Sequence, residues 1–318
     1  MYKMSYDIQI GNFKVKNLMD VEVRKSANKL TDTATIKMVG MSENKALEVE
    51  SKIKRGDQVN IKLGYNTTLH QEFLGYVSSI ATDNTITIEC EDGMFLYRKE
   101  VENKQYKKIT VVDLITQVAS QLTTMKVVAG PGTDIVKYDK FTVNNATAFD
   151  VFKKIQEETK LQIFVKGNEL HVHLKFTYNE GKVNYDFSKN VEKSSLKFVK
   201  EEDKKVLVEV VGIKRNNEKT TVIVGDKGGD KTTIHRYNVS DKSALQKIGE
   251  EELKKHRYTG YEGSITGWLF PYITYGYSAE IFDRDYPARK GIYYTEAVKT
   301  RFNKSGGSRQ ITLGILLT

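Results

Sequence analysis

His171 and His173 are the residues whose spacing most directly suggests chemistry. Two histidines that alternate along a strand share one face, and such a pair can bind zinc. No cysteine, histidine or acidic cluster stands near them in the sequence to complete the site. Leu170, Val172 and Leu174 occupy the opposite face of the same strand. We therefore expect the histidines to face solvent or a subunit interface and to bind no metal.

Two segments that contain glycine resemble binding motifs, but both are better explained as turns. Residues 225–231 are glycine-rich and basic, yet they lack the Gly-x-x-x-x-Gly-Lys-Ser/Thr spacing of a phosphate-binding loop, and a strand follows them. We interpret this segment as a hairpin tip. Arg55, Gly56 and Asp57 spell an adhesion tripeptide, but a Gly-Asp pair before alternating apolar residues is an ordinary turn signal.

Acidic residues offer the only other candidates for catalysis. Glu280, Asp283, Asp285 and Glu296 are close in sequence, but glycosidic cleavage needs two carboxylates held at a set separation, which sequence cannot place. The chain has no Gly-x-Ser-x-Gly elbow and no His-Glu-x-x-His motif, and Cys90 has no evident general base. We predict that the protein is not an enzyme and has no catalytic, cofactor-binding or metal-binding residues.

Composition indicates a folded, strand-rich protein. The 318 residues are enough for two or three domains, and a hydrophobic share of 39% makes long disordered stretches unexpected. The net charge of +9 is spread along the chain, so no nucleic-acid-binding patch is indicated. A single cysteine excludes an intrachain disulfide and suits a reducing cytoplasm. No apolar run approaches the roughly 20 residues of a membrane span.

A strand pattern near the start of the chain returns near its end. The first copy, residues 56–90, and the second copy, residues 276–315, each alternate apolar and polar residues in short runs separated by turns. Such alternation is typical of half-buried antiparallel strands in a small barrel. The sequence therefore predicts two related small β-barrels in one chain, which is a way to build a ring.

Helical spacing between and after these copies divides the chain. Helices are predicted from Thr110 and from Thr147, and a hairpin over 161–174 follows them. A later helix is predicted at 241–257, capped by Ser240 or Asp241. The predicted fold is mainly β with an α+β insert: a first barrel domain at 1–100, the insert at 101–175 and a second barrel domain at 176–318.

The order of these short motifs resembles a known family. Residues 54–59, 72–77 and 87–92, followed by the helical insert, the late helix and residues 276–317, are similar to baseplate hub proteins of contractile phage tails. This is the late control protein D family, and the same module begins the spike proteins of type VI secretion. The resemblance covers essentially the whole chain, and its specificity lies in the order of the motifs.

The resemblance implies a structural function. Proteins of this family are trimers in which two tube-like barrels per chain alternate around a channel, so that a three-fold ring presents a pseudo-six-fold face. The implied partners are the tail tube protein, a separate spike protein, baseplate wedge proteins and a tape-measure protein, with DNA only in transit. The implied location is the bacterial cytoplasm during assembly and then the baseplate of a virion or tail-like particle. We further expect a polar bore that is not strongly positive, with the surplus of basic residues on outer surfaces.

Two other functions remain open from the sequence. Small barrels can bind single-stranded nucleic acid through aromatic side chains beside basic ones. A dense aromatic stretch lies just beyond Lys254, Lys255 and Arg257, and it consists of Tyr258, Tyr261, Trp268, Phe270, Tyr272, Tyr275 and Tyr277. The same composition is typical of a large protein interface, which we favour. A cell-wall hydrolase is the third alternative.

Overall fold

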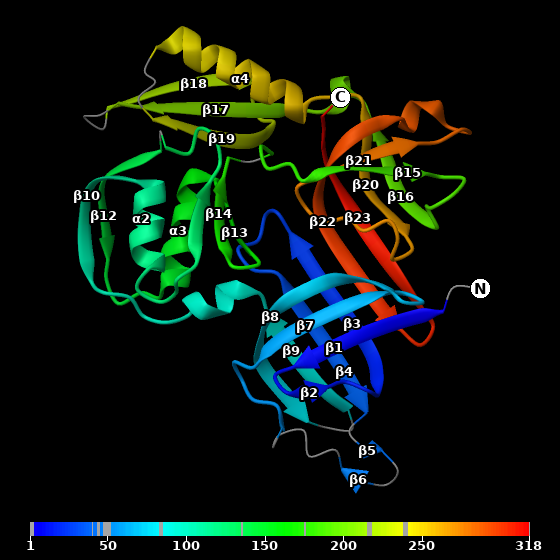
Figure 1. The fold of residues 1–318 in the computed structure, drawn as a ribbon. Helices are drawn as coiled ribbons and strands as arrows, with labels where there is room; N and C mark the ends of the chain where they lie inside the picture. The colour runs from blue at the N-terminus through cyan, green and yellow to red at the C-terminus, as the bar shows by residue number, and fades with distance from the viewer. Residues whose placement is uncertain are drawn as a thin grey trace.

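The computed structural model describes residues 3–39, 41–42, 45–46, 52–82, 85–134, 136–174, 176–214, 218–237 and 241–317. Strands make up 54% of the structure and helices 16%, so the predicted class, mainly β with an α-containing insert, is confirmed. Figure 1 shows two strand-rich regions in contact, a helical region beside them and a separate layer that carries the last helix. No helix in the described ranges is long and apolar enough to cross a membrane.

The N-terminal region is built on six strands, which we call the first strand set. They are β1 (Met4–Ile10), β3 (Leu18–Ser26), β4 (Thr33–Val39), β7 (Gln58–Tyr65), β8 (Thr68–Thr82) and β9 (Thr85–Glu91). Their order in the sheet is β3-β4-β9-β8-β7-β1, and every neighbouring pair is antiparallel. Three short strands accompany them: β2 (Phe13–Lys14), β5 (Met41–Ser42) and β6 (Lys45–Ala46).

The C-terminal region contains a second strand set. Its members are β15 (Gly181–Asp186), β16 (Lys193–Val199), β20 (Gly260–Gly267), β21 (Tyr277–Phe282), β22 (Gly291–Asn303) and β23 (Gly306–Leu316). Their order is β16-β20-β23-β22-β21-β15. If the six strands of each set are numbered in chain order, both sets have the same order in the sheet: second, third, sixth, fifth, fourth, first. They differ at one end, because β15 is parallel to β21 whereas β1 is antiparallel to β7.

Register details also match between the two sets. In the first set a register shift between Val77 and Ser79 interrupts the β8–β9 ladder, and Ile80 then lies opposite Ile88. In the second set a shift between Thr295 and Ala297 interrupts β22–β23, and Val298 then lies opposite Ile311. Apolar pairs stand at the same place after the same irregularity. The two copies of the sequence pattern are thus two versions of one antiparallel arrangement.

The two sets form one open sheet in the described residues, because β22 is long enough to pair twice. Its first half pairs with β21, and its second half, residues 297–303, pairs with residues 20–26 of β3. The result is a 13-stranded sheet with no closed barrel. The expected small barrels are therefore replaced by two curved parts of a shared sheet, with buried residues at alternating positions of strands such as β4, β9 and β23.

The insert lies between the strand sets and contains two helices. After the 3₁₀ helix η1 (Gly93–Tyr97) come β10 (Lys104–Thr110), α2 (Val111–Ala119), β11 (Lys126–Ala129), β12 (Lys137–Val143), α3 (Ala148–Thr159), β13 (Gln162–Lys166) and β14 (Glu169–His173). Thr110 and Thr147 cap the helices, each accepting a hydrogen bond from the backbone three residues later, as predicted. The predicted hairpin is β13–β14, to which β11 adds in parallel.

A second layer interrupts the second strand set between β16 and β20. It consists of η2 (Glu201–Asp203), β17 (Val206–Ile213), β18 (Lys219–Gly225), β19 (Asp230–Tyr237) and α4 (Lys242–His256), and a last 3₁₀ helix, η3 (Pro287–Arg289), follows β21. Asp241 caps α4, as predicted, while Ser240 lies outside the described residues. Gly249 lets the helix approach its sheet, because a Cβ there would lie 2.6 Å from Val224.

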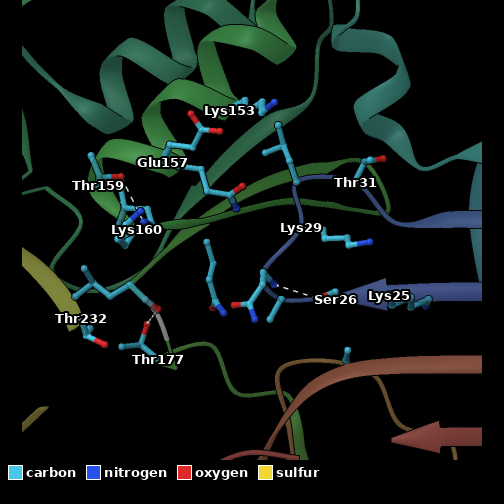
Figure 2. Close-up of a pocket in the computed structure, with 18 of the residues that line it drawn as sticks. Lys25, Ser26, Lys29, Thr31, Lys153, Glu157, Thr159, Lys160, Thr177 and Thr232 are labelled. Atoms are coloured by element: carbon cyan, nitrogen blue, oxygen red, sulfur yellow. Dashed lines mark hydrogen bonds between the residues drawn. The ribbon is translucent and has the colours of Figure 1, made fainter. Parts of the chain in front are cut away.

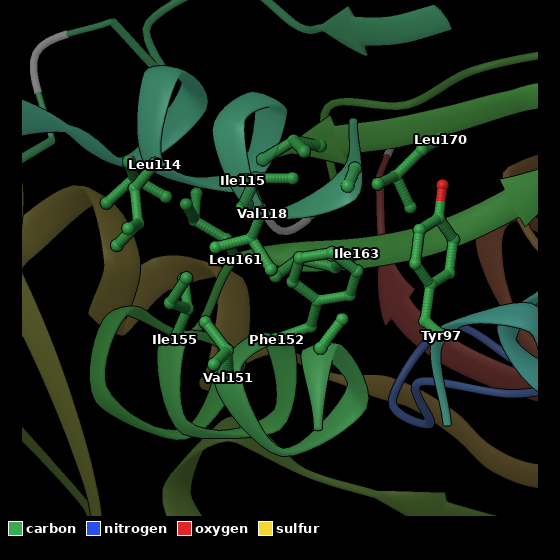
Figure 3. Packing of buried hydrophobic residues seen from close by; sticks show 14 of the residues in the cluster. Tyr97, Leu114, Ile115, Val118, Val151, Phe152, Ile155, Leu161, Ile163 and Leu170 are labelled. Atoms are coloured by element: carbon green, nitrogen blue, oxygen red, sulfur yellow. The ribbon is translucent and has the colours of Figure 1, made fainter. Parts of the chain in front are cut away.

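The core of the insert gives a direct test of its packing. Phe152 is fully buried at its centre and contacts Tyr97 edge-on at 5.1 Å between ring centroids (Figure 3). Phe152→Ala should lower the free energy of unfolding by about 3–5 kcal/mol, because it removes a buried ring and leaves a cavity. Urea unfolding followed by circular dichroism measures this loss.

The matched control is Phe282→Ala, because Phe282 is 49% exposed. That change should stay within about 0.5 kcal/mol. Equal losses for the two variants would contradict the packing described here.

Candidate functional site

A fully buried ion pair joins the two strand sets. Arg309 of β23 donates through Nη2 to Oε1 of Glu72 in β8, and the side chains are 0% and 3% exposed. Arg309 Nε also donates to Thr300 Oγ1 at 3.4 Å, and Thr300 Oγ1 donates to Glu72 Oε2 at 3.2 Å. Each charge is thus compensated by a partner and by further hydrogen bonds, which burial of charge requires.

The same arginine fixes the loop between β20 and β21. Arg309 Nη1 donates to the carbonyl oxygens of Leu269 and Pro271, the latter at 2.8 Å. Leu269 itself is buried in the core of the first strand set, although it follows a strand of the second. The loop therefore crosses from one set to the other, and the arginine holds its backbone there.

The aromatic stretch predicted as an interface mostly packs inside the molecule. Phe270 contacts His70 edge-on at 4.9 Å, Tyr272 stacks on the same ring at 5.5 Å, and Tyr275 is buried. Trp268 is the member that stays largely exposed, at 50%. Phe270 and Tyr272 thus join the second strand set to the first through His70, while Tyr258, Tyr261 and Tyr277 pack against the core of the second set.

Removal of the buried arginine should be costly. Arg309→Met leaves Glu72 buried without its partner and should lower the free energy of unfolding by about 3–5 kcal/mol. The double variant Arg309→Met, Glu72→Leu should recover part of that loss, because no uncompensated charge remains. Chemical denaturation of the three proteins measures both effects.

Arg301→Met is the control, since Arg301 is 56% exposed and bonds Glu22 at the surface. It should cost at most about 1 kcal/mol. A double variant no more stable than Arg309→Met alone would refute the role assigned to the ion pair.

A pair of buried carboxyl groups lies where the first strand set meets the insert. Asp92 accepts hydrogen bonds from the backbone of Asp32 at 2.9 Å and from Thr31 Oγ1 at 2.8 Å, and Asp32 accepts one from the backbone of Ser26 at 3.1 Å. Burial raises the pKa of both groups, to about 8 for Asp32, where the charge of Asp92 adds to the effect, and to about 6 for Asp92. Lys25 opposes the rise at Asp32.

This pair makes stability depend on pH. The folded pKa values lie above the ordinary value of 3.8, so the free energy of unfolding should fall as the pH rises from about 4 to about 8. Asp32→Asn keeps the acceptor for Ser26 but cannot ionise. It should reduce that slope by up to about 1.4 kcal/mol per pH unit. Urea unfolding at several pH values measures it.

Asp7→Asn is the control, because Asp7 is exposed and pairs with Lys14 on the surface. It should leave the slope between pH 4 and pH 8 as in the unchanged protein. An unchanged slope in Asp32→Asn would show that this carboxyl group does not titrate there.

The prediction that His171 and His173 face solvent or an interface is wrong, because both are buried, at 6% and 7% exposure. Their strand, β14, is the middle strand of three and is covered on both faces. His171 stacks on Phe164 at 5.1 Å, and His173 contacts Tyr178 at 4.7 Å. Burial lowers the pKa of both histidines, that of His173 to about 4, so both are neutral at pH 7. They form a packed aromatic cluster.

The acidic residues considered for catalysis are separated into structural contacts. Asp283 accepts from Arg289 at 2.7 Å and from two backbone amides; burial alone would raise its pKa, but these bonds hold it below its ordinary value. Glu280 pairs with Lys182 at 2.7 Å, and Glu296 accepts from Asn28. Within the described ranges no three metal-ligating side chains gather at one place.

Of the two predicted turns, one is confirmed and one is wrong. Gly56 has φ +92°. The backbone N–H of Asp57 donates to the carbonyl oxygen of Lys54, and the backbone N–H of Lys54 donates to the Asp57 carboxylate. The tripeptide is therefore a turn that opens β7, as predicted. The interpretation of residues 225–231 as a hairpin tip is wrong. They connect β18 to β19, which both pair with β17 and lie on opposite sides of it. The segment therefore crosses the end of β17.

A wide basic cleft of about 1140 Å³ lies between the insert, the layer of α4 and the large sheet. Figure 2 shows Lys153 and Lys160 on α3 and at its C-terminal end, and Lys29 on the connection between β3 and β4. Its basic lining residues are Arg24, Lys25, Lys29, Lys153, Lys160, Lys231, Arg236, Lys255 and Lys299. Glu157 and Glu252 are its acidic ones. Arg24 and Lys299 pair with Glu22, Lys231 with Glu209 and Lys255 with Glu252, so part of this positive charge is compensated within the protein.

Sequence reasoning missed the Arg309–Glu72 pair, although one signal marks it. Arg309 stands in register with Ile311, Leu313 and Ile315, which are the buried positions of β23. A charged residue in a buried register needs a charged partner. Only the fold identifies that partner, 237 residues away.

Comparison with known proteins identifies the fold. No family model matches this sequence, and no curated protein sequence matches it significantly. The 43 kDa tail protein of prophage MuSo2 from Shewanella oneidensis is similar in structure, with a TM-score of 0.66, 12% identity and 97% of each chain covered. A tail protein of Neisseria meningitidis MC58 gives 0.66 and 12%, over 98% of this chain and 97% of that one. The fold is that of phage tail proteins.

The same fold extends to type VI secretion. The Escherichia coli c3393 protein is described as a component of that system with structural similarity to the T4 tail proteins gp27 and gp5. It has a TM-score of 0.63 at 10% identity and covers 97% of this chain and 76% of its own. The expected likeness to phage tail and type VI spike proteins is thus confirmed at the level of fold.

Proposed function

We propose that this protein is the structural baseplate hub of a contractile injection system, such as a phage tail or a tail-like bacteriocin. Three copies form a ring that joins the tail tube to a central spike. The observation that carries the proposal is the repeated strand order, because six similar strand sets in three chains give a pseudo-six-fold face on a three-fold body. The shared fold with phage tail proteins over nearly the whole chain supports it.

The organisation of the chain follows from this role. We assign residues 1–100 and 176–318 to two ring-forming domains and residues 101–175 to an outer domain that faces wedge proteins. The spike is a separate polypeptide, and the tube protein and a tape-measure protein meet the ring, with DNA only in transit. Assembly takes place in the bacterial cytoplasm, and the ring then remains in the baseplate of the particle.

In this role the protein connects the tube to the spike and catalyses no reaction. The candidate acidic residues are occupied in ion pairs and backbone contacts, and the histidine pair is packed among aromatic rings. A rigid ring needs firm joints between similar parts, which the buried ion pair between β8 and β23 provides within the chain. The bore is expected to be polar without strong positive charge, so that a passing polyanion is not retained.

Mass in solution tests the ring. The purified full chain should have a mass about three times its 36.3 kDa by light scattering, and electron microscopy should show rings with a central opening. When the ring is mixed with the tail tube protein of the same particle, tubes should start from one face of the ring.

A monomer at high concentration that also fails to start tubes would contradict the proposal. The comparison measurement is binding of single-stranded DNA at 50 and 200 mM salt. Tight binding that weakens steeply with salt would favour a nucleic-acid-binding protein instead.

A further inference from the structure

In the described residues the two strand sets are joined by one backbone ladder, which we call the joint. Residues 297–303 of β22 run antiparallel to residues 20–26 of β3, with Ala297 opposite Ser26 and Lys299 opposite Arg24. β22 is the fifth strand of the second set, and β3 is the second strand of the first. The joint uses the part of β22 that follows its register shift.

The equivalent strands of the opposite sets are β8 and β16. β8 is the fifth strand of the first set and carries the same register shift, after which Ser79 corresponds to Ala297 and Ala81 to Lys299. β16 is the second strand of the second set. The register of β16 follows from the third strand of each set. Ile36 in β4 lies opposite Val21, and Ile265 in β20 lies opposite Ser194, so Ser194 of β16 corresponds to Val21 of β3.

Both equivalent edges are unpaired in the described residues. β16 ends the sheet and pairs only with β20, and beyond Tyr76 the strand β8 pairs only with β9. Exposed main-chain edges of this kind readily accept another strand. Phe198 on β16 is a large apolar side chain that is 41% exposed beside this edge. In the joint inside the chain, the equivalent position is the half-buried Lys25.

We propose that residues 79–82 of β8 in one chain pair antiparallel with residues 196–199 of β16 in a second copy of this chain. This inference rests on the proposed ring, and it names the surface that closes it. Transfer of the register from the joint inside the chain places Ile80 opposite Phe198 and Ala81 opposite Lys197. The apolar contact then covers the exposed phenyl ring of Phe198, and no two like charges face each other. Three such contacts alternate with three joints inside the chains.

A disulfide between the two edges tests the pairing. The variant Ala81→Cys, Lys197→Cys places two thiols on facing residues, where Cβ atoms of antiparallel strands lie about 4.5–5.5 Å apart. Both original side chains are exposed, so folding should be unaffected. Six strands separate β16 from β8 within one chain, so a bond between them should link chains. Oxidation should give covalent dimers and trimers on a non-reducing gel.

The matched control is Ala81→Cys, Lys193→Cys. Lys193 lies on the same face of β16, four residues from Lys197, which is about 13 Å along the strand. The native thiol should not react, because Cys90 is buried and burial raises its pKa to about 12. The control pair and each single variant should give no covalent trimer.

A charge exchange checks the same contact without oxidation. Ala81→Lys places a like charge opposite Lys197 and should weaken each contact by up to about fivefold, and Lys197→Glu in the same chain should restore it. Light scattering across a dilution series measures the change. A trimer that forms no specific cross-link, or one that links the control pair equally well, would overturn this pairing and leave the ring intact. A protein that remains monomeric would overturn both proposals.

Discussion

The buried ion pair between Arg309 and Glu72 is the constraint on which the arrangement of the strand sets depends. A ladder of main-chain hydrogen bonds between β22 and β3 fixes register, but by itself it leaves a sheet free to twist. The guanidinium group adds a second fixed point on the other side of the joint, because it bonds β8, β22 and the loop before β21 together. A charge removed from water holds its partners in place, since any rearrangement would leave it uncompensated.

This constraint lies between two strand sets of the same order within one chain. In the proposed ring, the joint inside the chain is covalently tethered, so it can carry contacts that the joints between chains lack. Arg301 and Lys299 both pair with Glu22 across β22 and β3, whereas the corresponding positions on β8 and β16 carry no such set of charges. The joint inside the chain is thus polar and stabilised by ion pairs, while the equivalent free edges are short and weakly charged.

Local features of the fold were predictable from the sequence, and long-range ones were not. Helix starts at Thr110, Thr147 and Asp241 could be predicted because a cap and its helix lie within four residues. Strand alternation was equally local. The burial of His171 depends on Phe164 and Tyr178, whose rings contact it. Phe164 is covered in turn by Tyr275, from the loop between β20 and β21, which no local pattern places there. The path of residues 225–231 depended on the strand inserted between their two neighbours, so turn chemistry alone was misleading.

The interruption of the second strand set has a further consequence for how such a protein can change over generations. In the first set, residues 27–32 connect β3 to β4; in the second, residues 200–259 connect the equivalent strands β16 and β20, yet the ladder between them is preserved. A connection about tenfold longer costs only about 2 kcal/mol in chain entropy, and the layer of β17–β19 and α4 has a core of its own to offset that cost. The connection between β16 and β20 is therefore a site that tolerates insertion. New surface can be added there, and altered independently, while the sheet that it interrupts keeps its geometry.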